Sequence, residues 1–432
     1  MAQNTDIHLQ NQTIYSIFVR NHTPEGTFRA VIPDLDRIKA LGTDIIWLMP
    51  IHPLGVKGRK GSLGSPYACR DYRSVNPEYG TMEDFTALVD AIHARGMKCI
   101  IDVVYNHTSP DSLLYTEHPE YFCRDENGKP GNKIGDWSDV IDLDYSAKGL
   151  WDYQIESLCM WAKYVDGFRC DVASFVPLEF WKAARRAVEA VHPGCIWLAE
   201  SVHLDFGIYA RRRGIYSMLD YEGYEAFDME YDYDLRRVFD DYLKGKRNLS
   251  HYIELLNFQE GCYPVNYNKL RSIENHDQPR ICSFVEGEAA RRSFTALLYF
   301  LKGTTLIYAG QEFENEHCPS LFDKDTIDRG SGRDLSALMQ RLYGIKKRFG
   351  ADDRFFGDAD DENDIALLRR SGFERCFAGI FSLKGKRAEL EIDIPDGEYV
   401  NLIDGGSVRV EGGKITCTGE PIIIELPGEV PV

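Results

Sequence analysis

The sequence predicts an α/β fold: a (β/α)8 TIM barrel with a short insertion after strand 3 and a C-terminal antiparallel β-domain. Three observations predict it. Eight short apolar runs alternate with longer amphipathic segments between about residues 13 and 345. The alternation is interrupted once, after the third run, by a segment with little apolar periodicity. It stops at about residue 350, where short alternating or apolar runs separated by glycine-rich turns begin.

The eight apolar runs are the expected barrel strands. They are apolar on both faces, which is typical of parallel strands covered by helices. The segment 82–96 shows the helical pattern that separates them, because its apolar residues, among them Phe85, Leu88 and Ile92, recur at helical spacing. We expect strands at residues 13–19, 44–49, 98–105, 167–171, 195–200, 226–231, 271–275 and 304–310.

The breaks in this pattern divide the chain into three parts. We expect residues 1–106 and 148–348 to form the barrel. Residues 107–147, rich in Gly, Asp, Asn and Pro, are expected to form an inserted domain. Residues 349–432 are expected to form a C-terminal β-sandwich domain. Its expected strands lie at residues 376–383, 388–394, 398–403, 408–413 and 421–426.

Charge narrows the class of partner. Acidic residues outnumber basic ones, 68 to 50, and the formal net charge is −18. Such a surface repels nucleic-acid phosphates and anionic lipid headgroups, so we expect neither nucleic acid nor a membrane as partner. A neutral substrate is compatible with this charge. The oligomeric state is left open.

The cysteines and the first residues indicate the compartment. Eleven cysteines are scattered without a Cys-x-x-Cys pair, which favours reduced, buried thiols over a disulfide framework or a zinc site. The first ten residues, MAQNTDIHLQ, lack the basic and apolar regions of a secretion signal. No apolar run approaches the roughly 20 residues of a membrane span. We therefore expect a cytoplasmic protein.

Polar residues close the predicted strands, at the end of a barrel where active sites lie. Asn106 and His107 follow the third strand. On the fourth strand, Arg169 and Asp171 are two residues apart and share a face. The guanidinium is expected to lower the pKa of this carboxyl and keep it ionised, as a nucleophile requires. A purely structural ion pair would use the same two residues.

Two further acids close the fifth and seventh strands. Glu200 follows a buried run, where partial desolvation raises the pKa of a carboxyl and favours the protonated form that a general acid needs. Asp277 directly follows His276, and a helix N-cap would explain Asp277 equally well. Each acid alone has an ordinary structural explanation, but together they converge on one barrel mouth.

With these motifs the sequence resembles the α-amylase family of glycoside hydrolases. Four motifs occur in the family's order at the expected strand ends: DVVYNH, GFRCD, the Glu of LAES, and ENHD. SPYACRDY at 65–72 resembles the loop whose Tyr stacks on the sugar that is cleaved. VIDLDY at 140–145 resembles a short motif near the end of the family's inserted domain. The resemblance covers nearly the whole chain.

The resemblance implies a retaining mechanism with three catalytic carboxylates. Asp171 is expected to be the nucleophile that forms a covalent glucosyl-enzyme, and Glu200 the general acid and then the general base. Asp277 is expected to stabilise the oxocarbenium-like transition state and to bind sugar hydroxyls. In this mechanism the nucleophile and the acid/base lie about 5–5.5 Å apart.

The resemblance also implies four substrate-binding residues. His107 and His276 would hydrogen-bond the sugar at the position of cleavage, and Tyr67 would stack on it. Arg169 would hold Asp171 in its ionised form.

One departure from the family pattern narrows the substrate. Many endo-acting α-amylases carry a Lys-His pair just after the nucleophile, whereas this chain has VASF at 172–175, closer to cyclomaltodextrinases, neopullulanases and small α-glucosidases. We therefore expect a hydrolase of α-1,4-linked maltodextrins or maltooligosaccharides. A transglycosylase or isomerase of the same family, such as a glucanotransferase or trehalose synthase, remains an alternative. An inactive carbohydrate-binding or scaffold relative is a less favoured one.

The resemblance leaves calcium open. In calcium-binding members a structural Ca²⁺ joins the insertion to the barrel through an Asn that matches Asn106 and an Asp that Asp142 would match. Oxygen ligands of this kind suit Ca²⁺. In calcium-free relatives the same Asn hydrogen-bonds within its loop. We expect the reaction to require no cofactor, and we assign no metal ligands from the sequence.

Overall fold

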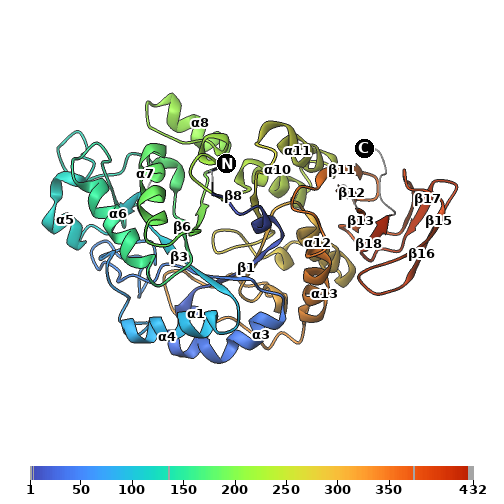
Figure 1. The fold of residues 1–432 in the computed structure, drawn as a ribbon, viewed down its shortest axis with the longest axis horizontal. Coiled ribbons are helices and arrows are strands. Elements are labelled where there is room, and N and C mark those ends of the chain that lie inside the picture. Colours follow the sequence, from blue (N-terminus) through green and yellow to red (C-terminus); the bar gives the residue numbers. More distant parts are fainter. Residues whose placement is uncertain (1, 3, 135–136, 373–374, 427–432) are drawn as a thin grey trace.

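The computed structural model describes residues 2, 4–134, 137–372 and 375–426, and its main body is a closed barrel of eight parallel strands (Figure 1). Around the barrel the strands follow the order β1-β10-β9-β8-β7-β6-β3-β2. The predicted fold class is therefore confirmed. The strands are β1 (Thr13–Ile17), β2 (Ile45–Leu48), β3 (Lys98–Val103), β6 (Gly167–Cys170), β7 (Ile196–Ala199), β8 (Met229–Tyr231), β9 (Lys269–Arg271) and β10 (Thr304–Tyr308).

Two strands differ from their predicted positions. The strand predicted at 271–275 lies earlier, as β9, because the chain leaves the sheet and turns back on itself where Asn275 bridges Gln278. The strand predicted at 226–231 starts late, as β8, because the backbone N–H of Phe227 still donates to a carbonyl of the preceding helical turn. In both places apolar residues next to the sheet are buried without belonging to it.

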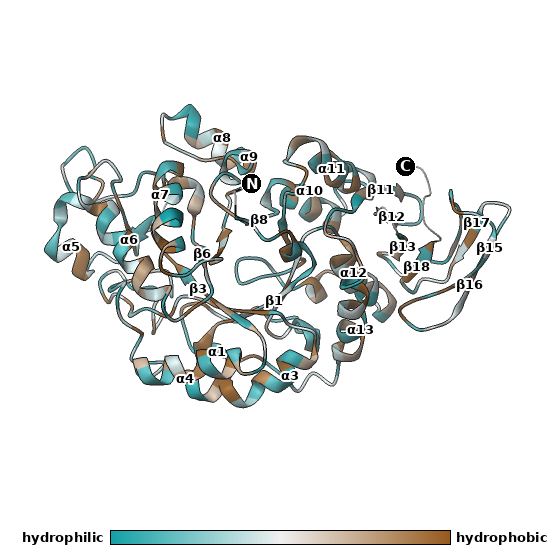
Figure 2. Ribbon diagram, in the orientation of Figure 1, coloured by the Kyte–Doolittle hydropathy of each residue, from teal (hydrophilic) through white to brown (hydrophobic). Residues whose placement is uncertain are grey.

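Helices cover the outside of the barrel and turn their apolar faces toward it (Figure 2). Helix α4 (Met82–His93) shows how the sequence specifies them: Thr81 and Asp84 form a capping box at its start. Its predicted apolar face is fully buried. Helix α8 (Leu204–Arg212) packs instead on a separate small apolar cluster. The remaining helices are α1 (Val19–His22), α2 (Phe28–Val31), α3 (Leu35–Ala40), α6 (Leu150–Trp161), α7 (Leu178–Glu189), α9 (Asp220–Gly223), α10 (Tyr233–Leu243), α11 (Leu249–Cys262), α12 (Glu288–Phe300) and α13 (Ser336–Lys346).

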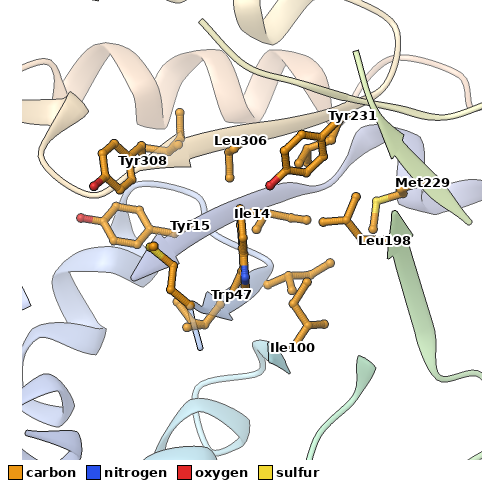
Figure 3. Packing of buried hydrophobic residues seen from close by; sticks show 14 of the residues in the cluster. Ile14, Tyr15, Trp47, Ile100, Leu198, Met229, Tyr231, Leu306 and Tyr308 are labelled. Atoms are coloured by element: carbon orange, nitrogen blue, oxygen red, sulfur yellow. The ribbon is translucent and has the colours of Figure 1, made fainter. Parts of the chain in front are cut away.

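The barrel interior is packed with side chains rather than open. Ile14, Ile100, Leu198 and Leu306 meet inside it together with Trp47, which is completely buried (Figure 3). Truncating a buried Trp to Ala typically costs about 3–5 kcal/mol of stability. Because the interior is filled, a site in the barrel lies at a rim, and in barrels of this kind the active site lies at the C-terminal strand ends.

The insertion is pinned to the barrel by a short antiparallel pair. Strand β4 (His107–Thr108) pairs with β5 (Ile141–Asp142), so the segment returns to the place where it left. Between them lie the short helix α5 (Leu113–Glu117) and turns. The insertion therefore stands over one side of the barrel mouth.

The C-terminal part consists of two four-stranded antiparallel sheets, ordered β11-β12-β13-β18 and β14-β17-β16-β15, with a separate apolar core. Three strands, β11, β12 and β17, were not among those predicted. Residues 427–432 of the predicted domain lie outside the described residues. The strands are β11 (Arg354–Asp360), β12 (Ile365–Ser371), β13 (Cys376–Ser382), β14 (Ala388–Glu391), β15 (Gly397–Val400), β16 (Ser407–Glu411), β17 (Lys414–Cys417) and β18 (Ile422–Leu426).

The cysteines and the helix lengths can be compared with the expectations from the sequence. All eleven cysteines are free thiols, and Cys262 alone among them is exposed. Every helix in the described residues is too short or too polar to cross a lipid bilayer.

Candidate active site

A cavity of about 390 Å³ opens at the C-terminal ends of the barrel strands. Tyr67, His107, Asp171, Glu200 and Asp277 line it. The other two predicted site residues lie directly behind this lining and hydrogen-bond to it, as described below. The fold thus brings all seven predicted residues together from five different strand ends or loops.

Asp171 follows β6 and points into the cavity. Its Oδ1 accepts a hydrogen bond from Arg169 Nη1 at 2.8 Å, as expected for two residues on one face of a strand. Its Oδ2 lies 3.8 Å from His107 Nε2. The carboxylate is buried and faces a cation on one side and an imidazole on the other.

Arg169 joins three carboxylates. It is fully buried, and its guanidinium reaches Asp102 at 2.9 Å and Glu200 at 3.0 Å in addition to Asp171. It also lies over the ring of Trp47, 5.2 Å from the centroid, so the packed barrel interior supports it from below.

Burial decides the protonation of this cluster. It raises the pKa of Asp171 to about 6 and that of Glu200 to about 7, although Arg169 opposes both shifts. Arg169 lowers the pKa of Asp171 as expected, but desolvation outweighs the guanidinium, so the net shift is upward rather than downward. The order of the two values still leaves Glu200 the more readily protonated of the pair.

Glu200 follows β7 and is held by a backbone group as well as by Arg169. Its Oε2 accepts a hydrogen bond from the N–H of Val172 at 2.7 Å. Val172 has a φ of +44°, a conformation that β-branched residues rarely adopt. A strained residue directly after Asp171 thus connects the two acids through the backbone.

Asp277 lies in the turn after β9 and not at a helix N-cap. Its carboxylate is 40% exposed to the cavity, and Oδ2 lies 3.0 Å from His276 Nε2. Although burial opposes it, the partnership with Asp277 raises the pKa of His276. Burial likewise acts against ionisation of Asp277, but His276 and Arg169 together lower its pKa. Asp277 is therefore the acid in this site that stays ionised most readily.

Tyr67 lines the cavity and packs on His276, which lies directly behind it. Their rings are stacked at a centroid distance of 5.5 Å, and the Tyr67 hydroxyl lies 2.7 Å from His276 Nε2. The hydroxyl also donates to Asp102 at 3.2 Å. Tyr67 is thus oriented by polar contacts while part of its surface faces the cavity.

His107 connects the insertion to the site. It begins β4, it lines the cavity, and its ring lies 5.8 Å from that of Trp137. Burial lowers the pKa of His107, which favours a neutral imidazole that can donate one hydrogen bond and accept another.

Several residues of the site have no role that could be assigned from the sequence. Asp102 is completely buried and contacts both Arg169 and Tyr67. An acid inside the apolar run of β3 was a usable signal for it, since its partner in the sheet register is Arg169. Phe206 and Phe322, which also line the cavity, gave no comparable signal because they lie in loops or helices whose position depends on tertiary contacts.

The residues matched to a family calcium site face a cation of the chain itself. Lys133 Nζ donates to Asn106 Oδ1 at 3.3 Å, and the Lys133 backbone N–H donates to Asp142 Oδ2 at 2.8 Å. The second oxygen of Asp142 is buried without a hydrogen-bond partner among the described residues. Ca²⁺ takes about six to eight oxygen ligands, and an ammonium group at Asn106 would repel it. This donor set does not fit calcium.

Comparison with known proteins gives matches along nearly the whole chain. The family model described as alpha amylase, catalytic domain, matches residues 5–138 and 134–354. The model described as bacterial alpha amylase C-terminal domain matches residues 357–424.

Among solved structures, an alpha-amylase from Lactobacillus plantarum is 46% identical, with a TM-score of 0.93, over 97% of this chain and 100% of that one. A maltogenic alpha-amylase, AmyB, from Thermotoga neapolitana is 32% identical, with a TM-score of 0.86, over 98% of this chain and 100% of that one.

Curated relatives are more distant and differ in activity. An oligo-1,6-glucosidase from Halalkalibacterium halodurans is 26% identical over 70% of this chain and 65% of its own length. An alpha-1,4-glucan:maltose-1-phosphate maltosyltransferase from Myxococcus xanthus is 31% identical over 43% of this chain and 32% of its own length. The chain thus spans about one third to two thirds of these relatives.

Proposed function

The chain belongs to the α-amylase family of glycosidases and transglycosylases, and from this premise we propose that it is a retaining hydrolase of α-1,4-linked maltooligosaccharides. One observation carries the proposal: a single buried guanidinium contacts both Asp171, at 2.8 Å, and Glu200, at 3.0 Å. The two carboxyls are thereby kept close together, as nucleophile and acid/base must be in a retaining enzyme.

Asp171 and Glu200 divide the chemistry. Asp171 attacks the anomeric carbon and forms a covalent glycosyl-enzyme, while Glu200 donates its proton to the departing glycosidic oxygen. Glu200, now ionised, then takes a proton from the water that hydrolyses the intermediate. Because the pKa of Glu200 is raised to about 7, its carboxyl carries a proton near neutral pH and can donate it in the first step.

The remaining site residues act on the sugar that is being cleaved. Asp277, ionised and exposed to the cavity, stabilises positive charge at the anomeric centre and accepts hydrogen bonds from sugar hydroxyls. His107 binds hydroxyls of the same ring, and Tyr67 packs against its apolar face. His276 lies behind the cavity lining and positions Tyr67 and Asp277 through its Nε2. Arg169 acts as a positioning residue, because it contacts the carboxyls and not the cavity.

Two features support short α-glucans as the substrate class. The family acts on neutral sugars, and the segment directly after Asp171 differs from that of many starch-degrading members. Val172 and the residues after it place apolar groups where many starch-degrading members carry a Lys-His pair. This supports short soluble glucans over polymeric starch. A cytoplasmic location remains a prediction from the sequence.

A transglycosylase or isomerase is the second candidate, favoured by the maltosyltransferase relatives. It would use the same acids and differ in admitting a sugar rather than water as acceptor. Incubation with maltotriose, followed by chromatography of the products, separates the two. Glucose and maltose are expected from the hydrolase, whereas longer oligosaccharides or trehalose would displace the hydrolase proposal. The inactive scaffold alternative is disfavoured by the contacts that connect the acids.

We propose that the enzyme works without calcium, because Lys133 already places a cation at Asn106. Treatment with EDTA followed by gel filtration is expected to leave both the activity and the midpoint of thermal unfolding unchanged. A fall in either one that added Ca²⁺ restores would contradict this.

A further inference from the structure

The loops that follow β2 and β10 are joined to each other across the rim of the cavity. Ser62 donates to Asp323 Oδ1 through both its backbone N–H, at 2.8 Å, and its hydroxyl, at 2.6 Å. The N–H groups of Leu63 and Gly64 both donate to the Phe322 carbonyl, at 2.9 and 3.2 Å. We call residues 61–65 and 320–323 together the closed rim.

The approach of the two loops depends on a glycine. Gly61 has a φ of +62°, and a Cβ there would lie 2.8 Å from the Phe322 carbonyl oxygen and 2.6 Å from its Cβ. Any other residue would push the two segments apart. The local sequence is therefore suited to this contact.

A buried arginine anchors the closed rim from below. Arg20 is completely buried, and its Nη1 donates to the carbonyls of Gly64, at 3.0 Å, and Leu321, at 3.1 Å. Its other nitrogens form a two-point contact with Glu78 at 2.8 and 2.9 Å. One charged group thus ties both loops to the first part of the barrel.

The closed rim lies across the barrel mouth from Glu200. In the closed strand order, β2 and β10 are each three strands away from β7, and β1 between them is the fourth. Ser65, Leu321 and Phe322 from this rim line the same cavity as Glu200.

The position of the acid fixes the direction of the substrate. A general acid protonates the oxygen of the bond that breaks, so the leaving part of the glucan, the aglycone, lies on the side of Glu200. The retained part, the glycone, ends in the non-reducing terminus and extends toward the opposite side. The closed rim therefore stands where the glycone would continue.

On the side next to Glu200, aromatic side chains extend from the cavity to the protein surface, where a longer glucan could lie on them. Phe206 of α8 lines the cavity, and its ring stacks on that of Tyr209 at a centroid distance of 6.4 Å. Tyr209 is 49% exposed. His203 and Tyr233, stacked at 4.8 Å, line the cavity on the same side. Aromatic faces therefore run from the cavity out to the surface of α8, which projects from the body in Figure 1.

We propose that the closed rim ends the glycone side of the site, so that the enzyme acts on non-reducing ends and removes short units, while the rest of the chain lies over Phe206 and Tyr209. This rests on the proposed function as an α-glucan hydrolase. It adds which end of the glucan is attacked and how short the released unit is, which the three carboxylates alone leave undetermined. The hydrogen bonds of the closed rim, and not the catalytic acids, limit how many glucose units fit on the glycone side.

The test compares two maltoheptaoses that carry a fluorescent label at the reducing end. One is unmodified, and the other has a 4,6-O-ethylidene group on the non-reducing glucose, which blocks a site that must enclose this end. We expect the unmodified substrate to lose one short unit at a time, and the blocked one to react at least about tenfold more slowly. Equal rates, with cuts in the middle of the chain, would overturn the inference and leave the hydrolase proposal intact. Failure to cleave either substrate would overturn the proposed function, and the inference with it.

Variants assign the effect to the closed rim. The double substitution Ser62→Ala and Asp323→Ala removes the side-chain contacts between the loops, and we expect the blocked substrate to gain at least about threefold relative to the unmodified one. Asp361→Ala is the matched control, since Asp361 accepts the same pair of bonds from Ser250 far from the cavity, and should leave this ratio unchanged. If the double variant unfolds, the wild-type comparison of the two substrates decides alone. An unchanged ratio in a folded double variant would overturn the role of the rim.

Discussion

The rim of the cavity across from Glu200 and the rim beside Glu200 are held by different forces. The closed rim consists of two loops joined by backbone hydrogen bonds around the buried charge of Arg20. On the other side, α8 rests on a small apolar cluster that includes Phe175 and Ala210, and Leu204 and Tyr209 remain exposed.

These two kinds of contact make the barrel mouth asymmetric. Backbone hydrogen bonds around a charge are directional and rigid, so the loops that they join can stop a substrate. A helix packed on a few apolar side chains leaves its outer face free to contact a chain of variable length. Specificity for short glycones would then come from one side and tolerance of long aglycones from the other.

The largest expected effect distinguishes the acid beside α8 from the nucleophile. Glu200→Gln should lower the rate on maltotriose by about 10²–10⁴-fold, because leaving-group protonation is lost. On α-maltosyl fluoride, whose leaving group needs no proton, much of the first-step rate should return. Asp171→Asn should stay inactive on both substrates, since the nucleophile is missing.

Circular dichroism spectra of both variants serve as the control for folding. If Asp171→Asn were rescued by the fluoride and Glu200→Gln were not, the two roles would have to be exchanged, and the glycone and aglycone sides with them.

The next effect concerns the stability of the two rims. Arg20→Ala leaves buried carbonyls without a donor, and we expect the free energy of unfolding in urea to fall by about 3 kcal/mol. Arg237→Ala is the matched change on the other side, where an exposed arginine pairs with Asp205 of α8 at 2.7 Å. It should cost less than about 1 kcal/mol. Similar losses for both variants would show that the rims are not held differently.

The pH profile tests the acids that lie between the rims. Asp171 must be ionised, so kcat/KM should fall as the pH drops below about 6, and Glu200 must be protonated, so it should fall as the pH rises above about 7. Each limb should approach a tenfold change per pH unit, with apparent values that belong to the coupled cluster. In Glu200→Gln with α-maltosyl fluoride, the alkaline limb should be absent. Its persistence would assign that limb to another group.

The smallest effect concerns the aromatic side. Tyr209→Ala should raise KM about threefold for maltoheptaose and leave that for maltotriose unchanged, because only the longer aglycone reaches the surface of α8. Tyr221→Ala, which removes another exposed tyrosine, is the control and should change neither value. Equal effects on both substrates would mean that Tyr209 acts through the structure of the site and not through a chain lying on it.

The sequence located the acids well and the supporting contacts poorly. Asp171 and Glu200 directly follow apolar strands, and the barrel rule places such residues at one mouth. The pKa of Asp171 was misjudged because proximity of Arg169 is visible in the sequence, whereas the depth of burial that outweighs it is not. In the C-terminal sheets, β11 was missed because only one of its faces is buried.

The residues that shape the site depend on contacts between distant parts of the chain. Ser62 and Asp323 are 261 positions apart, and Arg20 and Leu321 are 301 apart. Nothing in either local sequence indicates its partner. Such contacts follow from closure of the barrel, which brings β2 and β10 to neighbouring positions beside β1.

The class of fold could be read from the sequence, as could the placement of Asp171, Glu200 and Asp277 at the ends of strands that meet at one mouth, because strand periodicity and strand-end polarity are local properties. Three features became visible only in the folded chain: Arg169 contacts three carboxyls, Lys133 lies at Asn106, and one rim is closed while the other is open. These depend on distances across the barrel and on desolvation, which arise when strands far apart in sequence close into one ring.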